Sequence, residues 1–272
     1  MRTQEEKGSV FRSLHERTGA FVIPNPWDLG SARLLEGMGF EALTTTSAGY
    51  AFSLGKRDGA VGRDAMMAHV ASLAPSTNLP LSVDLENGFG DAPEFVVETI
   101  RMAAEAGAVG GSIEDATGRT DEPIYDVGLA VERILAAVEA TRGLPFAFTL
   151  TARCENYLHE RPDLADTIRR LQAYQEAGAD VLYAPGLTSH DEIATLVKSV
   201  DRPVNVLVGF KGIRLSLAEA SALGVKRLST GSALGRAAYG ALLSAAEEMQ
   251  QNGTFCFGDD AVGFSDLSKK FF

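Results

Sequence analysis

The chain has 272 residues, of which 45% are hydrophobic and 22% charged, a composition that is ordinary for a globular protein with a sizeable core. Its formal net charge of −11 and its lack of any basic run argue against a surface for nucleic acid or anionic membranes. No stretch reaches membrane-spanning length, and the N-terminus has no apolar signal region.

Cysteine and histidine usage gives no sign of a metal–thiolate site. Cys154 and Cys256 lie far apart and without metal-ligand spacing, so we expect reduced thiols in a cytoplasmic protein. The histidines fall on or near helices and loops, where we expect ordinary surface roles for His15, His69, His159 and His190.

Short apolar runs alternate with helical segments along the whole chain. The first segment, about residues 3–17, predicts a polar amphipathic helix that could cover the bottom of a barrel. Strands are expected at about residues 21–23, 42–45, 79–83, 109–113, 146–150, 180–184, 203–207 and 226–229. Helices are expected from about Asp28 to Met38, around Met66 and Ile134, and at about residues 93–106, 164–177, 193–200, 217–223 and 233–249.

Eight such alternations with short loops fit an α/β fold of the (β/α)₈ TIM-barrel type better than an open doubly wound sheet. No G-x-G-x-x-G sequence follows the first strand, which weakens a dinucleotide-binding alternative. We therefore predict a single barrel domain over residues 1–272, with an N-terminal helix at 3–17 and a C-terminal helical tail at 233–272. In such a barrel the chemistry lies at the C-terminal ends of the strands.

Acidic residues stand at two of these strand ends. Asp84 and Glu86 end the third strand, and Glu114 ends the fourth about thirty residues later, which is one strand–helix–strand unit. Adjacent strand ends would bring the three carboxylates together. Oxygen ligands of this kind suit Mg²⁺ or Mn²⁺ better than zinc. The alternative, that these acids cap helices or lie in solvent, stays open at this point.

A cation and several small polar residues stand at other strand ends. Arg153 follows the fifth strand, and its planar guanidinium could bind a substrate carboxylate. A structural salt bridge to Glu155 or Glu114 is the alternative. The turn Thr46–Gly49 offers hydroxyls and backbone N–H groups, which predicts an anion-binding concavity after the second strand. Together these parts predict a pocket for a small acid held by a divalent metal.

Several of these segments carry a resemblance that covers about Ala20 to Gly235. They are Pro24-Asn25-Pro26-Trp27-Asp28, Thr45-Thr46-Ser47-Ala48-Gly49, Leu54-Gly55-Lys56-Arg57-Asp58-Gly59, Asp84-Leu85-Glu86-Asn87-Gly88-Phe89-Gly90, Ile113-Glu114-Asp115 and Ala152-Arg153. In this order they resemble the isocitrate lyase/phosphoenolpyruvate mutase superfamily. The resemblance implies a (β/α)₈ barrel whose eighth helix is swapped between the subunits of a homodimer or homotetramer. It also implies Mg²⁺, with Mn²⁺ possible, and enolate chemistry on a small oxo- or hydroxy-carboxylate.

The resemblance also assigns roles to individual positions. The implied metal ligands, direct or through metal-bound waters, are Asp84, Glu86 and Glu114. The implied substrate-binding residues are Thr46, Ser47, Ala48, Asp58, Arg153 and Asn205, the last of which lies near a polar position of strand seven. The implied catalytic residues are Asp58, Arg153 and Glu114.

The departures from the family pattern bear on the activity. The isocitrate and 2-methylisocitrate lyases carry Lys-Lys-Cys-Gly-His after strand four, whereas residues 117–123 of this chain contain neither Cys nor His. Ala184 and Pro185 stand where the lyases have a Glu at the end of strand six, and Glu86 stands where the mutases usually have Asp. The lid with Lys and Asn that is typical of the mutases is also not evident. Cys154 lies on another strand and is expected to be a packed thiol, so the proton donor stays unassigned.

Three functional hypotheses follow. The first is a Mg²⁺-dependent carbon–carbon lyase, or a decarboxylase, that acts on a small 2-oxo or 2-hydroxy carboxylic acid through an enolate. The second is carbon–phosphorus chemistry, as a mutase or hydrolase. The third is a barrel that binds an oxo acid without turning it over. The loop between Ala116 and Asp126 matches no subgroup, so it does not identify the substrate.

Overall fold

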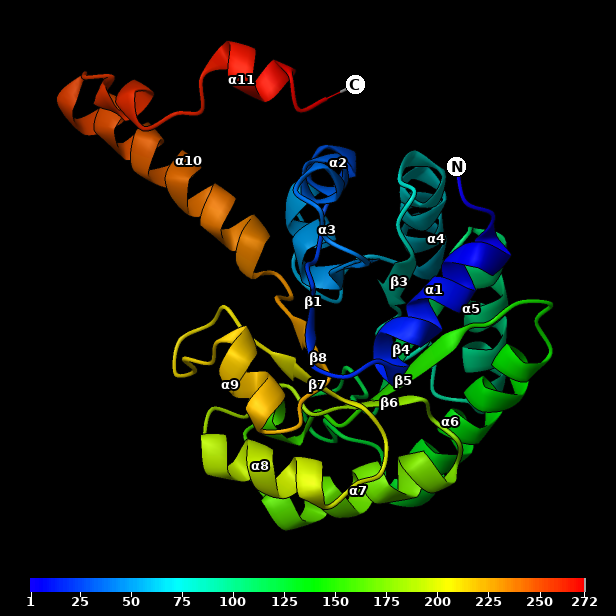
Figure 1. The fold of residues 1–272 in the computed structure, drawn as a ribbon. Helices are drawn as coiled ribbons and strands as arrows, with labels where there is room; N and C mark the ends of the chain where they lie inside the picture. Colours follow the sequence, from blue (N-terminus) through cyan, green and yellow to red (C-terminus); the bar gives the residue numbers. More distant parts are fainter. Residues whose placement is uncertain (272) are drawn as a thin grey trace.

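Eight parallel strands form a nearly closed barrel at the centre of the computed structural model, which describes residues 1–271 (Figure 1). The pairing order is β1-β8-β7-β6-β5-β4-β3-β2, and a hydrogen bond from the Thr44 N–H to the Pro24 carbonyl bridges β2 and β1. The strands are β1 (Phe21–Ile23), β2 (Leu43–Thr44), β3 (Leu81–Asp84), β4 (Gly110–Glu114), β5 (Thr149–Arg153), β6 (Val181–Tyr183), β7 (Val204–Leu207) and β8 (Arg227–Ser229). The predicted (β/α)₈ TIM-barrel fold is confirmed.

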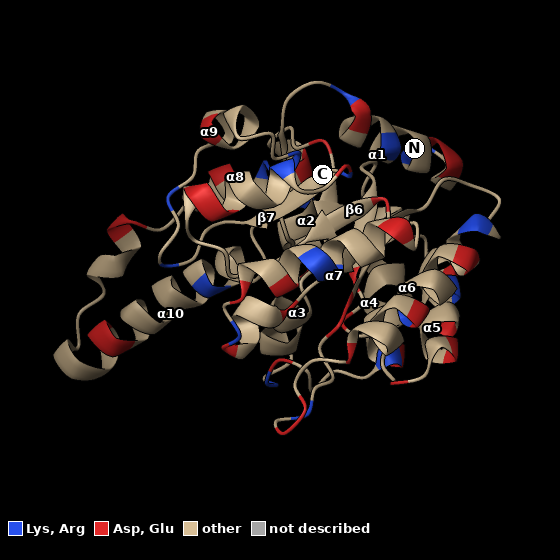
Figure 2. Cartoon of the chain, turned by 90° about the horizontal axis from the view of Figure 1, so that it is seen from below, with Lys and Arg blue, Asp and Glu red and all other residues tan. Residues whose placement is uncertain are grey.

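Helices follow the strands and cover the outside of the barrel (Figure 1). They are α1 (Gln4–Glu16), α2 (Leu29–Gly37), α3 (Ser47–Ser53), α4 (Arg63–Leu73), α5 (Pro93–Glu105), α6 (Val127–Arg142), α7 (Leu164–Glu176), α8 (His190–Lys198), α9 (Leu217–Ala222), α10 (Ala233–Asn252) and α11 (Phe264–Ser268). Short 3₁₀ helices are η1 (Ala74–Ser76), η2 (Asn156–His159) and η3 (Cys256–Asp259). Acidic and basic residues are interspersed over these outer helices (Figure 2).

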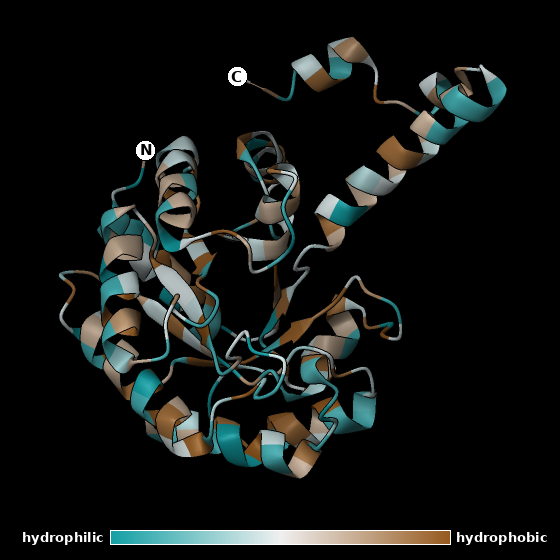
Figure 3. Cartoon of the chain, turned by 180° about the vertical axis from the view of Figure 1, so that it is seen from behind, coloured by the Kyte–Doolittle hydropathy of each residue, from teal (hydrophilic) through white to brown (hydrophobic). Residues whose placement is uncertain are grey.

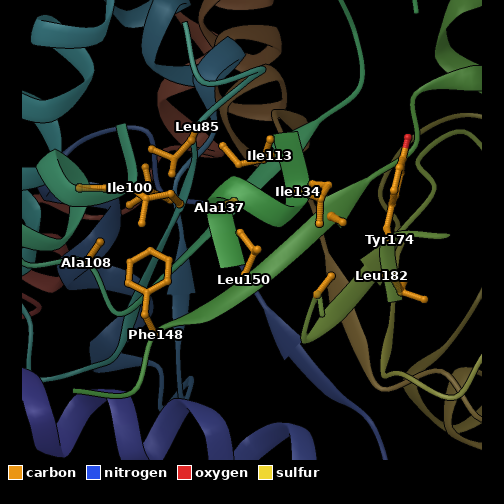
Figure 4. Close-up of a cluster of buried hydrophobic side chains, with 14 of the residues drawn as sticks. Leu85, Ile100, Ala108, Ile113, Ile134, Ala137, Phe148, Leu150, Tyr174 and Leu182 are labelled. Carbon is orange, nitrogen blue, oxygen red and sulfur yellow. The ribbon is translucent and has the colours of Figure 1, made fainter. Parts of the chain in front are cut away.

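The main hydrophobic core lies between the strands and the inner faces of the helices. Ile113 of β4 and Leu150 of β5 pack with Ile100 of α5 and Ile134 of α6 (Figure 4). Because side chains alternate along a strand, the neighbours of Ile113 and Leu150 point into the barrel instead. Those inward positions carry polar side chains on β4 and β5, so the barrel interior is polar at the level where the site forms.

Helix α1 closes the N-terminal end of the barrel, where the sequence predicted a covering helix. Phe11 and Leu14 of α1 pack with Phe21 and Ile23 of β1 in a second buried cluster. Gly8 allows this approach, because a Cβ atom there would lie 2.3 Å from the Ala147 carbonyl oxygen. The bottom of the barrel is therefore plugged, and its open end is the end at which the strands terminate.

The fifth strand is displaced from its predicted position. We expected it at residues 146–150 because that run is apolar, but β5 pairs with β4 from Thr149 to Arg153. Phe146 instead packs against the cluster under α1, which buries this part of the apolar run outside the sheet. In β5, the side chains of Thr149, Thr151 and Arg153 point into the barrel, and the apolar side chains between them point outward. A search for continuous apolar runs does not detect a strand with this pattern.

Two histidines are buried, so the expectation of surface roles is wrong for His15 and His69. His15 lies four residues after Phe11 on the inner face of α1, and its Nδ1–H donates to the Phe11 carbonyl. His69 stacks on Tyr50, with 3.8 Å between ring centroids. Burial lowers the pKa of His15 to about 3 and that of His69 to about 4.

Helix α10 leaves the barrel after β8 and extends away from it, and the chain then turns so that α11 runs back from the far end of α10 (Figure 1). Gly235 is its one buried residue, while Leu242 and Leu243 are 60% and 61% exposed. Figure 3 shows apolar and polar residues alternating along this arm. Among residues 1–271, no helix combines the length and the apolar character needed to cross a bilayer.

Candidate active site

The predicted acidic residues of β3 and β4 lie side by side at the open end of the barrel. Asp84 is the last residue of β3 and Glu114 the last residue of β4. Glu86 follows in the loop after β3, where its φ of 49° lies in the left-handed region and its carbonyl accepts the Glu114 N–H at 3.0 Å. The structure therefore brings the backbones of Asp84, Glu86 and Glu114 together.

Arg153 lies at the centre of these acids, because the β4–β5 register places it beside Glu114. Its Nη1 lies 3.1 Å from Asp84 Oδ1, and its Nη2 lies 3.1 Å from Glu114 Oε2 and 2.8 Å from Glu155 Oε1. Burial alone would lower the pKa of Arg153, but the charges of Glu155, Glu114 and Asp84 outweigh it and raise that pKa well above the usual value. Arg153 is thus charged and held rigidly.

Glu86 and Asp58 add two further carboxyl groups, neither of which forms an ion pair with Arg153. Burial, followed by the charges of Asp84 and Asp58, raises the pKa of Glu86 to about 8, and its Oε1 is buried without a hydrogen-bond partner. Asp58 stands on an exposed loop, yet partial desolvation of its carboxylate and the charge of Asp84 raise its pKa too. The pKa of Glu114 is raised well above its usual value by burial, against the opposing charge of Arg153.

The Thr46–Gly49 segment forms a helix start rather than the isolated turn that we predicted. Thr46 caps α3, and its Oγ1 accepts the Gly49 N–H at 3.1 Å. Ser47 donates to Asp84 Oδ2 through its N–H at 3.1 Å and through its hydroxyl at 2.8 Å. These donors therefore fix the orientation of Asp84, while Ala48 lines the cavity beside them.

Asn205 lies deeper than the other predicted residues. It is on β7, is buried, donates to Ser229 Oγ and accepts from Arg227 Nε. It lines a cavity of about 130 Å³ that also reaches Arg153 and the start of α3. Above this cavity a wider cleft of about 1260 Å³ extends between the loop that carries Asp58 and the segment after β4.

The donor set fits a divalent cation. Five carboxylates, those of Asp58, Asp84, Glu86, Glu114 and Glu155, surround the cleft floor, and Arg153 is the one guanidinium paired with any of them in the described chain. Within residues 1–271, no three of them already form a cage for a metal, since Arg153 lies between Asp84 and Glu114. The raised pKa values of Glu86 and Glu114 and the unpartnered oxygen of Glu86 are features that an oxygen-bound Mg²⁺ or Mn²⁺ would relieve.

Glu155 and Asp115 also belong to this site. The sequence pointed to Glu155 only as an alternative salt-bridge partner of Arg153, and it gave Asp115 no role. Glu155 accepts the Arg153 Nε–H at 2.8 Å. Asp115 points outward from the barrel and accepts the Glu155 N–H, the Tyr174 hydroxyl at 2.6 Å and Arg170 Nη1. The position of Glu155, two residues after Arg153 at the end of a strand, was the feature of the sequence that could have placed it in the site. No local sequence pattern indicates which residues Asp115 contacts.

The two cysteines are free thiols, as expected. Cys154 is buried next to Arg153 but points to the opposite side of β5, into the hydrophobic core. Burial raises its pKa well above the usual thiol value. Its position is that of a packed side chain and not of a group facing the cleft.

The family model described as phosphoenolpyruvate phosphomutase matches residues 11–250. The chain is 30% identical to the 2-methylisocitrate lyase of Escherichia coli strain K12 over 205 residues, which cover 72% of this chain and 68% of that one. Both comparisons span the strands that carry the acids and Arg153.

Solved structures agree with this match. A Burkholderia cenocepacia J2315 protein, described provisionally as a lyase/mutase, is 63% identical, with a TM-score of 0.96 over 98% of this chain and 96% of that one. Oxaloacetate acetylhydrolase in complex with the product oxalate is 25% identical, with a TM-score of 0.88 over 99% of this chain and 95% of that one.

Proposed function

This chain belongs to the phosphoenolpyruvate phosphomutase family, within the isocitrate lyase/phosphoenolpyruvate mutase superfamily, and from that premise we propose that it is a Mg²⁺-dependent carbon–carbon lyase or decarboxylase. Its substrate is a small 2-oxo or 2-hydroxy carboxylic acid that reacts through an enolate. The observation that supports this most is the set of five carboxyl groups around Arg153, of which Glu86 and Glu114 have pKa values raised by burial and by neighbouring acids, so that a bound cation would stabilise their ionised forms.

In this proposal Asp84, Glu86 and Glu114 hold Mg²⁺, or Mn²⁺ in its place. A bound divalent cation supplies Lewis acidity, which stabilises the negative charge that develops on a substrate oxygen. The Ser47 donors orient Asp84 for this task. Glu155 and, through it, Asp115 keep Arg153 in place beside the metal ligands.

Arg153 binds the substrate carboxylate and stabilises charge at the reacting centre. On substrate binding, Arg153 would give up some of its hydrogen bonds to Asp84 and Glu114 and form hydrogen bonds to the substrate carboxylate instead. Thr46, Ser47 and Ala48 form the wall beside it, and Asn205 contributes from the floor of the inner cavity. Asp58, at the rim of the cleft, positions the substrate or relays a proton.

The segment between Ala116 and Asp126 forms one side of the cleft and excludes water from it in this proposal. Its ends are joined by an antiparallel bridge between Ala116 and Ile124. Arg119 pairs with Asp91 at 2.6 Å and so ties the segment to the loop after β3. Because the segment lacks Cys and His, the proton that quenches the enolate comes from another group, for which Asp58 is the candidate.

Carbon–phosphorus chemistry is the second candidate, because the matching family model is that of a phosphomutase. The same metal and arginine would then stabilise charge as a C–P bond breaks. A barrel that binds an oxo acid without turnover is the third possibility. Product formation distinguishes the three, since only the first two consume a substrate.

We also propose a homodimer or homotetramer in which α10 packs on a second subunit, because α10 and α11 expose apolar side chains that a partner could cover. The single domain over residues 1–272, with its helical tail at 233–272, is part of this proposal. A cytoplasmic location is supported by the two unpaired thiols.

The test is a panel of small 2-oxo and 2-hydroxy dicarboxylates and phosphonopyruvate, assayed for release of pyruvate or another 2-oxo acid with Mg²⁺ and with EDTA. We expect turnover of at least one dicarboxylate with Mg²⁺ and none with EDTA. Glu114→Ala should abolish turnover and weaken Mg²⁺ binding in calorimetry, because it removes a ligand. Glu122→Ala, which is exposed on the segment after β4, is the matched control and should keep both.

Three outcomes count against parts of this proposal. Retained turnover in Glu114→Ala would remove the metal assignment. Consumption of phosphonopyruvate alone would favour the second candidate. Binding of oxalate with no turnover of any acid would favour the third.

A further inference from the structure

The loop that presents Glu86 has an unfavourable backbone conformation. Glu86, Gly88 and Phe89 have φ values of 49°, 80° and 62°, all in the left-handed region. Glycine adopts this region freely, but the side chains of Glu86 and Phe89 make it sterically unfavourable. Two such residues within four positions persist only where the surrounding structure holds them. The loop of residues 86–91 therefore needs contacts from other elements to keep its shape.

The side of this loop that adjoins β3 is anchored on the strands that carry the acids. The Glu86 N–H donates to Asp84 Oδ1 at 3.3 Å, and the Glu86 carbonyl accepts the Glu114 N–H at 3.0 Å. The chain after Glu86 is held from the outer helices instead. Thr99 of α5 donates to the Gly88 carbonyl at 2.9 Å. This single contact leaves the carbonyls on either side of Gly88 to be satisfied by another donor.

Arg133 of α6 is that donor. Its side chain is 1% exposed. Its Nη1 donates to the Gly90 carbonyl at 2.6 Å and also to the Asp91 carbonyl, and its Nη2 donates to the Asn87 carbonyl. Three carbonyls of one loop thus converge on one guanidinium, whose donors lie in a fixed plane. A single side chain therefore fixes both ends of the turn that follows Glu86.

Tyr125 supports both sides of this contact. Its ring centroid lies 4.5 Å from Arg133 Cζ, a cation–π arrangement. Its hydroxyl donates to Asp91 Oδ1 at 2.7 Å and accepts from Asn87 Nδ2 at 3.3 Å. The ring thus packs on the guanidinium, while the hydroxyl holds the two residues whose carbonyls that guanidinium binds.

The burial of Arg133 is not explained by an ion pair or by helix packing. Within residues 1–271, no carboxylate forms an ion pair with its guanidinium, and burial lowers its pKa. The next residue, Ile134, packs α6 into the apolar core, a task for which an apolar side chain suffices. Burying a charge for packing alone would be costly. The side-chain hydrogen bonds that Arg133 forms in the described chain all go to the loop of residues 86–91, so the loop is what this charge serves.

We propose that Arg133 is a positioning residue of the metal site, which holds the loop of residues 86–91 in the conformation that presents the Glu86 carboxylate to the cation. Arg133 contacts neither the substrate nor the acids, and it acts through the backbone carbonyls of residues 87, 90 and 91. The inference rests on the proposed function, because it takes Glu86 as a ligand of Mg²⁺. It adds a residue of α6, outside the barrel, to the groups that determine metal affinity.

The first test is the affinity for Mg²⁺, measured by calorimetry at one fixed pH. Arg133→Lys keeps a positive charge but loses the planar fork, so we expect it to weaken Mg²⁺ binding by about tenfold, as is typical when a partner of a metal ligand is lost. Lys7→Met is the matched control. Lys7 is also buried and also donates to two backbone carbonyls, those of Ala74 and Thr77, but it lies on α1 at the closed end of the barrel. Lys7→Met should lower stability in urea and leave the affinity for Mg²⁺ unchanged.

The second test separates positioning of Glu86 from a general structural role. Glu86→Gln leaves Asp84 and Glu114 as ligands and should weaken Mg²⁺ binding by itself. If Arg133 acts through Glu86, the two effects are not additive, so adding Arg133→Lys to Glu86→Gln should change the affinity by less than about twofold. A general loosening of the fold would instead produce the same tenfold loss in both backgrounds.

Unchanged Mg²⁺ affinity in Arg133→Lys, or an equal loss with and without Glu86→Gln, would overturn the positioning role and leave the metal assignment intact. Absence of Mg²⁺ binding by the wild type would overturn the metal assignment and this inference with it. If Arg133→Lys does not fold, Tyr125→Phe takes its place, because it keeps the ring on Arg133 and removes the hydroxyl that holds Asn87 and Asp91. We then expect about a threefold loss of affinity in the wild-type background and none in Glu86→Gln.

Discussion

At the scale of single residues, the site is governed by the competition among Asp84, Glu114 and Glu155 for Arg153. A guanidinium can satisfy several acids at once because its donors lie in a planar fork. A lysine ammonium presents one compact charge and cannot keep the three contacts. The exact shape of Arg153, and not only its charge, therefore sets how the acids are arranged.

Arg153→Lys should chiefly weaken substrate binding, since the fork that grips a carboxylate is lost. We expect KM to rise by about tenfold or more, with a smaller change in kcat. Steady-state kinetics on the substrate found in the panel would measure both. Arg169→Lys, at an exposed position of α7, is the control and should leave both constants unchanged. Unaltered KM and kcat in Arg153→Lys would argue against its assigned role.

Much of this residue-level site could be predicted. Strand ends in a barrel converge, so the positions of Asp84, Glu114 and Arg153 in the sequence were enough to predict that they would meet. Arg227 could not be found in the same way. Its inward direction follows from two-residue alternation with Ser229, but nothing in the sequence indicates that its partners are neutral, because those partners lie 22, 76 and 212 residues away.

At the scale of elements, α10 differs from every other long helix of the barrel. The other helices bury one face against the strands, whereas α10 buries Gly235 alone. If a second subunit covered the exposed side chains of Leu242 and Leu243, each would contribute about 2 kcal/mol to the free energy of association. An arm of this kind is unfavourable in water on its own and is consistent with the proposed contact between subunits.

Replacing Leu242 and Leu243 together by Ser should therefore shift the protein toward monomer, because the apolar area that would be covered is removed. Light scattering after size-exclusion chromatography measures the mass of each variant over a range of concentrations. The pair Gln250→Ser and Gln251→Ser, on the same helix, should keep the wild-type mass. A wild type that is monomeric at all concentrations would rule out the proposed assembly.

At the scale of the whole molecule, pH acts on stability through buried neutral histidines. His69 is stacked on Tyr50, has its Nε2 buried without a partner, and has a pKa of about 4 in the folded state, against 6.5 in the unfolded chain. Between these values the unfolded state binds the proton and the folded state does not. The contribution of His69 to stability is therefore complete above pH 6.5 and is lost as the pH falls toward 4.

His69→Phe keeps an aromatic ring on Tyr50 and removes this titration. The free energy of unfolding of the variant, relative to wild type, should rise by about 2 kcal/mol between pH 7 and pH 5. Urea unfolding at several pH values measures this difference. Tyr50→Phe is the control, because it changes the other ring of the stack and keeps His69. Its free energy of unfolding should depend on pH in the same way as that of the wild type. A difference between His69→Phe and wild type that does not vary with pH would contradict the assignment.

The alternation of apolar runs and helices was enough, by itself, to determine the barrel, the order of its strands and the ends at which the acids stand, because each of these depends on local periodicity and on connections of short length. Only the tertiary structure decided the position of β5, the helical start at Ser47, the burial of His15 and His69, and the inner cavity that Asn205 and Arg227 line. These features depend on which residues distant in sequence pack together. Phe146 packs against the cluster under α1, and small side chains from separate strands leave a cavity between them. Local sequence carries no record of such contacts, because their energy comes from partners that only folding brings near.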